Sequence, residues 1–447
     1  MRRFHGVERL CLLRRLPSAA LQRCLAVTPT LPRRHTHAGA TPTFAELVRP
    51  ELAERLQRIG CVRPNDVQLH ALSHALAGDD VIVSAQTGAG KTLSFLLPML
   101  QRLGDASRPT ATGGCVARPE GLVIVPTAEL VEQIGAIAED LCCSFAAPPS
   151  VGRASGARSA APRDGATLLV ATADEVIRRR REQSLCIDAL RVVAIDEADW
   201  ILCGQQRPAE EMADQLIGTL HASSRRESAA AACAEKMPPP LPQVLLSTAT
   251  LSDEHEAALL RRFPTARRVS QTGDLVPTLR QRFHYFRGDK DEQLRKVLVR
   301  ALGDAWLKEG STLVFASVAD EAERIRAKLL EEMRLPRVEL LHEQMPTEAR
   351  IAAVNAFRGD KTGLLVTTRL AARGLDFPHL RHVIVHAVEL DVTSFIHCAG
   401  RTARRGETGI VTCLVDTSVA GIYSHRGHHA LQPAPKMRFS KSPLNTE

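Results

Sequence analysis

The chain has 447 residues, which is too long for one ordinary hydrophobic core and suits two domains of usual size. Hydrophobic residues make up 44% of it and charged residues 24%, and its apolar runs have strand length, so we expect no transmembrane helix and no membrane partner. The formal net charge of +8 favours a polyanionic partner, and eleven scattered cysteines without a C-x-x-C pair predict neither a disulfide framework nor a structural zinc site.

Residues 1–41 contain eight arginines, no lysine and a single acidic residue, Glu8, among several leucines. This composition is typical of an amphipathic mitochondrial transit peptide. A disordered basic arm that binds nucleic acid has a similar composition and remains the alternative. The transit peptide is the interpretation that we prefer, and it predicts a mitochondrial location.

Short runs of Val, Ile and Leu alternate with helix-like stretches from about Phe44 onward, a pattern typical of βαβ units around a parallel sheet. We expect five buried strands in the first half of the chain, at 81–84, 122–125, 168–171, 192–195 and 244–247. We expect five more in the second half, at 312–316, 338–341, 364–367, 383–386 and 410–414. The predicted fold class is therefore α/β, with two mostly parallel sheets that carry helices on both faces.

Breaks in this periodicity predict the limits of the domains. Gly273 and Pro277 interrupt the pattern between the two series of strands. Two stretches rich in Ala, Ser, Arg and Pro, at 104–120 and 221–242, are expected to be surface insertions without assigned chemistry. The predicted segments are an arm at 1–41, a first domain at 42–270, a linker at 271–282, a second domain at 283–421 and a basic disordered tail at 422–447.

A glycine-rich stretch, AQTGAGKT at 85–92, follows the first predicted strand and precedes an apolar stretch that reads as a helix. In such a loop the backbone N–H groups cradle phosphates, Lys91 reaches the terminal phosphates and Thr92 binds Mg²⁺. The predicted nucleotide-binding residues are Ala85, Gln86, Thr87, Gly88, Ala89, Gly90, Lys91 and Thr92.

An acidic motif, DEAD at 196–199, follows the predicted strand 192–195. It lies at the carboxyl edge of the sheet, where ligands of open α/β sheets bind. Asp196 can hold Mg²⁺, and Glu197 is placed to orient or deprotonate the attacking water, because phosphoryl transfer depends mainly on positioning and charge neutralisation. The two motifs together predict a nucleotide hydrolase.

The order of AQTGAGKT and DEAD resembles that in the DEAD-box RNA helicase family. Further motifs of that family occur in order over about residues 44–415, among them PTAEL at 126–130, STAT at 247–250, LLVTTRLAARGLD at 364–376 and HCAGRTARRG at 397–406. The resemblance implies two tandem RecA-like domains that close over ATP and single-stranded RNA. It also implies ATP and Mg²⁺ as cofactors, and RNA as a partner contacted through its backbone with little sequence preference.

The resemblance also assigns roles to individual residues. It implies that Phe44 stacks on adenine, that Gln68 hydrogen-bonds the base and that Asp376 holds the ribose. Arg401 and Arg404 would act as arginine fingers on the γ-phosphate. The positions implied for RNA contacts are Pro126, Thr127, Thr172, Thr367, Arg373 and Gly374, of which Arg373 also supports the contact between the domains.

The arginine fingers are also supported by a physical argument that is independent of the resemblance. If Arg401 and Arg404 belong to one domain and the glycine-rich loop to the other, ATP is hydrolysed only when the domains close. RNA would then control hydrolysis by stabilising the closed state. The alternative for R-T-A-R-R-G alone is an ordinary basic surface turn, and the ordered companion motifs speak against it.

The chain departs from the family pattern at several places. Ala128 stands where Arg is usual, ATADEV at 171–176 replaces a Thr-Pro-Gly-Arg turn, Arg369 stands where Asp is frequent, and Cys398 replaces an Arg. The first two lie in loops expected to face RNA. A lost Arg removes a phosphate contact, and we expect Asp174 and Glu175 to add repulsion, so the first domain should hold RNA weakly.

Two functional hypotheses remain open. The leading one is a Mg-ATP-dependent RNA helicase that opens short duplexes, acting on mitoribosomal RNA if the transit peptide is real. The second is an ATP-gated RNA clamp or ribosome-assembly factor with weak or no unwinding activity, working with ribosomal or RNA-processing proteins. A P-loop enzyme acting on DNA is a third hypothesis, weakened by the full set of motifs.

Overall fold

The structure is a computed structural model of the chain. It describes residues 41–417 except 87, 105–115, 156–165, 204–214, 216, 219–241, 250, 272–277, 304–309, 336, 360–362, 370–371, 387–391 and 405–406. The predicted arm, except residue 41, the predicted tail and most of both predicted insertions lie outside the described residues. Among the helices that the structure describes, none is both long and apolar enough to cross a membrane.

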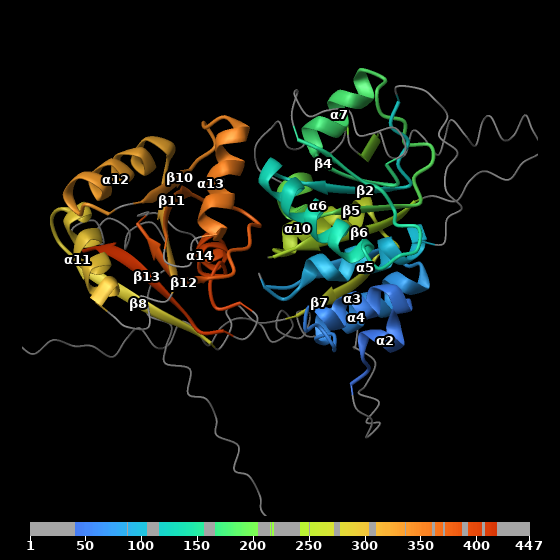
Figure 1. The fold of residues 1–447 in the computed structure, drawn as a ribbon, viewed down its shortest axis with the longest axis horizontal. Coiled ribbons are helices and arrows are strands. Elements are labelled where there is room, and N and C mark those ends of the chain that lie inside the picture. Colours follow the sequence, from blue (N-terminus) through green and yellow to red (C-terminus); the bar gives the residue numbers. More distant parts are fainter. Residues whose placement is uncertain are drawn as a thin grey trace, which may run out of the picture. The chain divides into compact units, whose positions relative to one another are not determined.

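The first sheet has seven strands in the order β3-β4-β2-β5-β6-β1-β7, and neighbouring strands pair in parallel (Figure 1). The strands are β1 (Val81–Ser84), β2 (Gly121–Val125), β3 (Val151–Ala154), β4 (Leu168–Thr172), β5 (Val192–Ile195), β6 (Gln243–Thr248) and β7 (Arg267–Ser270). The five predicted strands are the five inner ones, and the prediction missed the edge strands β3 and β7. Edge strands are half exposed and contain Gly or Arg here, so they lack an apolar run.

The second sheet has six parallel strands in the order β10-β11-β9-β12-β13-β8. They are β8 (Leu279–Phe286), β9 (Ser311–Ala316), β10 (Val338–Leu341), β11 (Leu364–Thr368), β12 (Leu380–Val385) and β13 (Gly409–Asp416). The prediction missed β8, whose middle residues are exposed at the edge of the sheet. The predicted linker is therefore too long at its C-terminal end, because residues 279–282 pair with β13.

Helices cover both faces of each sheet, as predicted (Figure 1). In the first domain they are α2 (Phe44–Leu47), α3 (Pro50–Arg58), α4 (Asp66–Ala77), α5 (Lys91–Gly104), α6 (Ala128–Cys142), α7 (Ala173–Arg181), α8 (Ala198–Cys203) and α10 (Asp253–Arg262). In the second they are α11 (Lys290–Gly303), α12 (Ala319–Glu332), α13 (Thr347–Gly359) and α14 (Val392–Ala399). Successive strand residues pack on opposite faces: Val81 and Val83 join the apolar cluster of α4 to α6, and Ile82 joins that of α7, α8 and α10.

The strand order brings three motifs to one edge of the first sheet. β5, β6 and β1 are neighbours, and their carboxyl ends lead into DEAD, STAT and AQTGAGKT respectively. Since parallel strands end at the same edge, motifs more than a hundred residues apart in the chain become adjacent. Open α/β sheets bind ligands at this edge, so the functional site is expected here.

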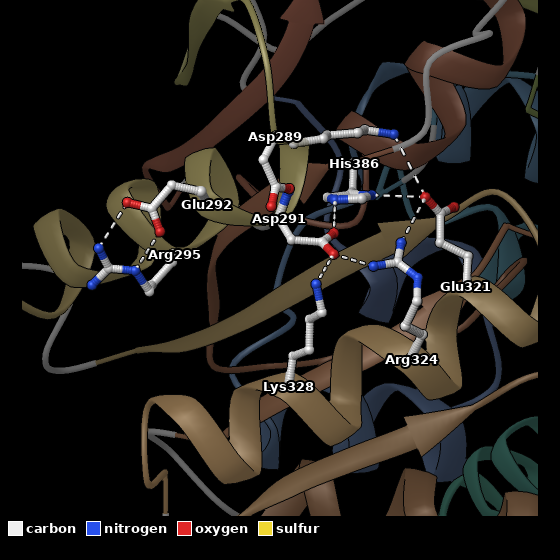
Figure 2. A network of polar contacts seen from close by, with 9 residues as sticks. Asp289, Asp291, Glu292, Arg295, Glu321, Arg324, Lys328 and His386 are labelled. Carbon is white, nitrogen blue, oxygen red and sulfur yellow. Dashed lines mark hydrogen bonds and ion pairs between the residues drawn. The ribbon is translucent and has the colours of Figure 1, made fainter.

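A polar network, buried at His386, joins helices α11 and α12 to the end of β12 in the second domain (Figure 2). The imidazole of His386 has no exposed surface, and its Nδ1 lies 3.0 Å from Glu321 Oε1 while its Nε2 lies 3.3 Å from Asp291 Oδ1. Lys328 Nζ lies 2.7 Å from Asp291 Oδ2, and Arg324 also pairs with Asp291. The network thus ties the first turns of both helices to the sheet.

We predict that Glu321→Gln destabilises the protein at neutral pH and removes part of its acid sensitivity. Burial by itself raises the pKa of Glu321, but His386, the backbone N–H of Ser317 and Lys290 outweigh it and hold that pKa at about 2. Ionised Glu321 therefore stabilises the folded state above its unfolded pKa of about 4.5, and this stability is lost as pH falls towards about 2. We expect a loss of about 1–3 kcal/mol at pH 7, measured by urea denaturation.

The matched control is Glu292→Gln. Glu292 also pairs with an arginine, Arg295, at 2.7 Å on α11, but both side chains are well exposed. Exposed ion pairs contribute little to stability, so this variant should unfold like the wild type. Equal effects of the two substitutions would show that the network around His386 does not stabilise the fold in the way described.

Candidate active site

The glycine-rich loop connects β1 to α5 and has the backbone geometry that its sequence requires. Gly88 and Gly90 adopt φ of 86° and 74°, in the left-handed region that disfavours side chains. A Cβ on Gly90 would come within 2.2 Å of Gln68 Nε2, so a side chain there would also displace the Gln68 amide. Lys91 Nζ donates to the carbonyls of Ala85 at 2.5 Å and Gln86 at 3.3 Å, which holds the ammonium within the loop. Thr87 lies outside the described residues.

The segment that precedes the loop is attached to it through α4. Asn65 caps this helix by accepting from Gln68 N at 2.9 Å, while Gln68 Oε1 accepts from Asn65 N at 3.0 Å. The side-chain amides of both residues also donate to the loop, Asn65 to Ala89 O at 2.8 Å and Gln68 to Gly90 O at 3.2 Å. Gln68 is therefore placed beside the phosphate loop, and its role in reading the base stays a prediction.

The ring of Phe44 is not exposed at this site. Its side chain is 2% exposed and belongs to the apolar core of the first domain, together with Leu52 and Leu56 of α3. The described structure therefore presents no free Phe44 ring for stacking on adenine.

Three buried carboxylates lie together after β5. Asp196 accepts from the Ser247 hydroxyl and from the backbone N–H of Glu197 at 3.0 Å. Glu197 has φ of 51°, a left-handed conformation that costs energy for a residue with a side chain and that often marks functional sites. Glu197 and Asp199 each have a buried carboxylate oxygen with no hydrogen-bond partner among the described residues. The site thus holds more negative charge than its own hydrogen bonds satisfy.

The surroundings of these carboxylates shift the pKa values of Asp196 and Glu197 in opposite directions. Burial raises the pKa of Asp196, and the neighbouring Glu197 raises it further. Burial also raises the pKa of Glu197, but the basic side chains around it, Lys91 most strongly and then Arg401 and Arg373, leave the pKa below its usual value. Glu197 is therefore the carboxylate that the surrounding cations keep ionised, which suits a group that orients or deprotonates water.

Two residues near the carboxylates were missing from the predicted site. Burial raises the pKa of Asp199, and the nearby Glu197 adds to this shift. Burial lowers the pKa of His397 to about 4, so its imidazole is neutral at pH 7. One ligand atom from each of Glu197, Asp199 and His397 lies within 4.8 Å of the others. The motif strings contain both residues, but only the tertiary structure places His397 of α14 beside DEAD.

The two predicted arginine fingers lie between the second sheet and the glycine-rich loop. Arg401 is 2% exposed, and it donates to the carbonyls of His397 at 2.9 Å and Leu375 at 3.1 Å. Burial lowers its pKa to about 9, so Arg401 is still charged at pH 7. A Cβ on Gly88 would lie 3.0 Å from Arg404 Cγ, which places Arg404 directly against the loop of the first domain.

Asp376 links the fingers to the first domain. Arg404 Nη1 lies 2.6 Å from Asp376 Oδ1, so the residue predicted to hold the ribose is paired with a predicted finger. The backbone N–H of Asp376 donates to Gln133 Oε1 of α6 at 3.0 Å, and Arg358 donates to the same oxygen. These contacts cross from one domain to the other. The structure therefore shows the two domains closed on each other.

Helix α6 supplies a second contact between the domains that the sequence did not predict. Arg350 Nε of α13 lies 2.9 Å from Glu129 Oε1, and Glu129 is 2% exposed. A Cβ on Gly374 would lie 2.7 Å from Leu130 Cδ1 on the same helix. Glu129 and Gln133 are four residues apart, so they share one face of α6. Glu129 and Gln133 at a spacing of four residues were the available signal, but α6 also contains Glu132, Glu139 and Asp140, so the sequence did not single them out.

Comparisons with known proteins agree with this arrangement. Residues 65–258 match the model of the DEAD/DEAH box helicase family, and residues 289–406 match that of the helicase conserved C-terminal domain. The ATP-dependent rRNA helicase RRP3 of Meyerozyma guilliermondii is 29% identical over 390 residues, covering 83% of this chain and 72% of that protein. The putative ATP-dependent RNA helicase T26G10.1 of Caenorhabditis elegans is 31% identical over 378 residues, covering 83% of this chain and 70% of that protein.

The chain belongs to the DEAD-box family of ATP-dependent RNA helicases. It is therefore an ATPase. The fold agrees with that of Saccharomyces cerevisiae Dbp5 bound to RNA and ADP BeF3, with a TM-score of 0.69 and 23% identity over 86% of this chain and 92% of that chain. The expectation of two tandem RecA-like domains is thus confirmed.

The positions implied for RNA contacts in this DEAD-box helicase differ in how open they are. Pro126 and Thr127 are half-buried, and Thr127 caps α6 by accepting from Leu130 N at 3.4 Å. Thr172 is half-buried at the N-cap of α7, and Gly374 adopts φ of 70°. Thr367, in contrast, has no exposed surface and donates to the carbonyl of Thr368 at 3.1 Å. In this structure its hydroxyl is not open to a phosphate.

The expected repulsion by Glu175 is wrong. Glu175 is 3% exposed and pairs with Arg178 at 2.7 Å and with Arg179 at 2.5 Å on α7, so its charge is compensated inside the domain. Asp174 is exposed on the first turn of that helix. ATADEV at 171–176 is thus the end of β4 and the start of α7 rather than a turn. Ala128 is also buried, at 5% exposure, so an arginine there would have to leave the packed face of α6.

Proposed function

We propose that this DEAD-box protein is a Mg-ATP-dependent enzyme that remodels short RNA duplexes and hydrolyses ATP only when its two domains close. One observation carries the proposal: Arg404 of the second domain lies against Gly88 of the loop that would hold the phosphates. Arg401, also of the second domain, lowers the pKa of Glu197 in the first domain. An active site assembled from both domains makes hydrolysis depend on closure, and any ligand that stabilises closure becomes an activator.

Magnesium fits the residues present. Thr92 and Asp196 would hold the ion. Glu197 and Asp199 each have a buried carboxylate oxygen with no hydrogen-bond partner among the described residues, so the site can accept a further positive charge. When bound, the ion would neutralise charge on the terminal phosphates. The chain's own residues would then act as follows: Lys91 binds the terminal phosphates, Glu197 takes or directs the proton of the attacking water, and Arg401 and Arg404 stabilise the charge that develops.

Closure also supports the remodelling of RNA. RNA bound through its backbone across both domains must adopt a shape compatible with the closed state, and a regular duplex is stiff. We propose ribosomal RNA as the substrate, since RRP3 is named an rRNA helicase, and ribosomal or RNA-processing proteins as partners. An ATP-gated RNA clamp with weak or no unwinding is the second candidate, favoured by the buried Ala128 and Thr367 at positions expected to contact RNA.

The test compares ATP hydrolysis by the full chain in the presence of single-stranded RNA and of single-stranded DNA. We expect single-stranded RNA to stimulate ATP hydrolysis, and single-stranded DNA of the same sequence to stimulate it little. A short RNA duplex should then separate on addition of ATP. RNA-stimulated hydrolysis without strand separation would favour the clamp. Equal stimulation by RNA and DNA would contradict the proposal.

We further propose a mitochondrial location, which rests on the composition of residues 1–41. Deletion of residues 1–40 should leave the protein in the cytosol without lowering its RNA-stimulated ATPase activity, because none of the proposed catalytic residues lies there. Fluorescence microscopy of tagged full-length and truncated chains measures the location. Import of the truncated chain would contradict the transit peptide and favour the alternative, a basic arm that binds nucleic acid.

A further inference from the structure

The indole of Trp200 makes a contact that none of the motifs accounts for. Trp200 lies in α8, immediately after DEAD, and the Arg373 Cζ atom lies 4.1 Å from the centroid of its ring. Trp200 belongs to the first domain and Arg373 to the second. A guanidinium placed over the face of an indole is attracted by the negative charge of the π-system, and Trp is the best aromatic partner for it.

This contact is connected to the catalytic carboxylate in two ways. The backbone N–H of Trp200 donates to the carbonyl of Glu197 at 2.9 Å, so the main chain that carries the indole is attached to the residue proposed to act on water. Arg373 also lowers the pKa values of Glu197 and Asp199, against the larger effect of their burial. The guanidinium that rests on the indole thus lies near the catalytic carboxylates.

Packing alone does not explain the position of Trp200. One part of its half-buried side chain packs against the apolar cluster formed by α7, α8 and α10. That packing would anchor α8 equally well with any large apolar side chain. The other part lies under Arg373, and only an aromatic ring attracts a cation there. The pair therefore forms when the domains close and is lost when they separate.

We propose that Trp200 is a positioning residue that holds Arg373 beside the catalytic carboxylates in the closed state and so strengthens the coupling between ATP binding and RNA binding. This inference rests on the proposed function and adds to it a residue outside the motifs. Trp200 itself touches neither the nucleotide nor the water. It acts through Arg373, because an interaction made only in the closed state raises the affinity of each ligand when the other is bound.

The test measures RNA affinity of the full chain with and without a non-hydrolysable ATP analogue, and the coupling factor is the ratio of the two affinities. In Trp200→Leu we expect the coupling factor to fall by between about 2-fold and about 30-fold, the range that corresponds to a cation–π contact. RNA affinity without nucleotide should stay unchanged. Trp200→Phe should restore most of the coupling, because it keeps an aromatic face.

Two further variants separate this role from a structural one. Phe145→Leu removes the ring beneath Arg49, whose Cζ lies 4.9 Å from the ring centroid, in a cation–π pair inside the first domain. It should lower stability but leave the coupling factor unchanged. The double variant Trp200→Leu with Arg373→Leu should lose no more coupling than Arg373→Leu alone, because the two residues act through one contact.

The outcomes distinguish the inference from the proposed function. Wild-type coupling retained in Trp200→Leu, or equal losses in the Leu and Phe variants, would overturn the inference. An equal loss of RNA affinity with and without nucleotide would also overturn it, since that is the result of a structural defect. If the wild type itself shows no coupling, the proposed function fails, and the inference fails with it.

Discussion

Arg401→Lys should lower the rate constant of RNA-stimulated ATP hydrolysis by about 10³- to 10⁵-fold, the usual worth of an arginine finger. Arg401 is buried at the contact between the domains, and its two carbonyl contacts fix the guanidinium in one orientation. Lysine keeps the positive charge but has neither the planar fork nor the reach to satisfy those carbonyls and a phosphate together. Single-turnover hydrolysis at saturating RNA measures the effect.

Arg326→Lys is the matched control for this experiment. Arg326 of α12 also donates to a backbone carbonyl in the second domain, that of Val338 at 2.9 Å, but it lies away from the active site. Its replacement should leave hydrolysis unchanged. ATP affinity of the RNA-free Arg401→Lys protein should change little, because the phosphate loop belongs to the other domain. Hydrolysis within 10-fold of the wild type would show that Arg401 is not a finger, since a finger is worth at least about 10³-fold.

Glu197→Gln should bind ATP and hydrolyse it about 10²- to 10⁴-fold more slowly, as expected when a general base is removed. The substitution keeps the size of the side chain and removes its charge. The buried oxygen of Glu197 with no hydrogen-bond partner among the described residues is the atom we expect to meet the attacking water. Because the charge repulsion with Asp196 also disappears, ATP should bind at least as tightly as in the wild type.

Lys91→Ala provides the contrast. The Lys91 ammonium lies within the phosphate loop, so its removal should weaken ATP binding itself. Equilibrium binding of a fluorescent ATP analogue and single-turnover hydrolysis separate the two defects. Normal turnover by Glu197→Gln, or normal binding by Lys91→Ala, would contradict the roles assigned here.

The sequence by itself determined the two sheets and the edge where the chemistry lies. Inner strands are buried on both faces, so each appears as an uninterrupted apolar run, and the motifs that follow β1, β5 and β6 meet because parallel neighbours end together. The edge strands β3, β7 and β8 have one open side and mixed composition, so they gave no such run.

Only the tertiary structure decided which side chains are in contact between the domains and which charges are compensated by a partner. Pairs such as Glu129 with Arg350 and Trp200 with Arg373 join residues that are far apart in the chain, where no periodic pattern relates them. At Glu175 local composition predicts an exposed acidic residue, but its charge is compensated by two arginines of its own helix. A motif specifies local backbone and residue type, whereas burial and charge balance depend on what packs against it.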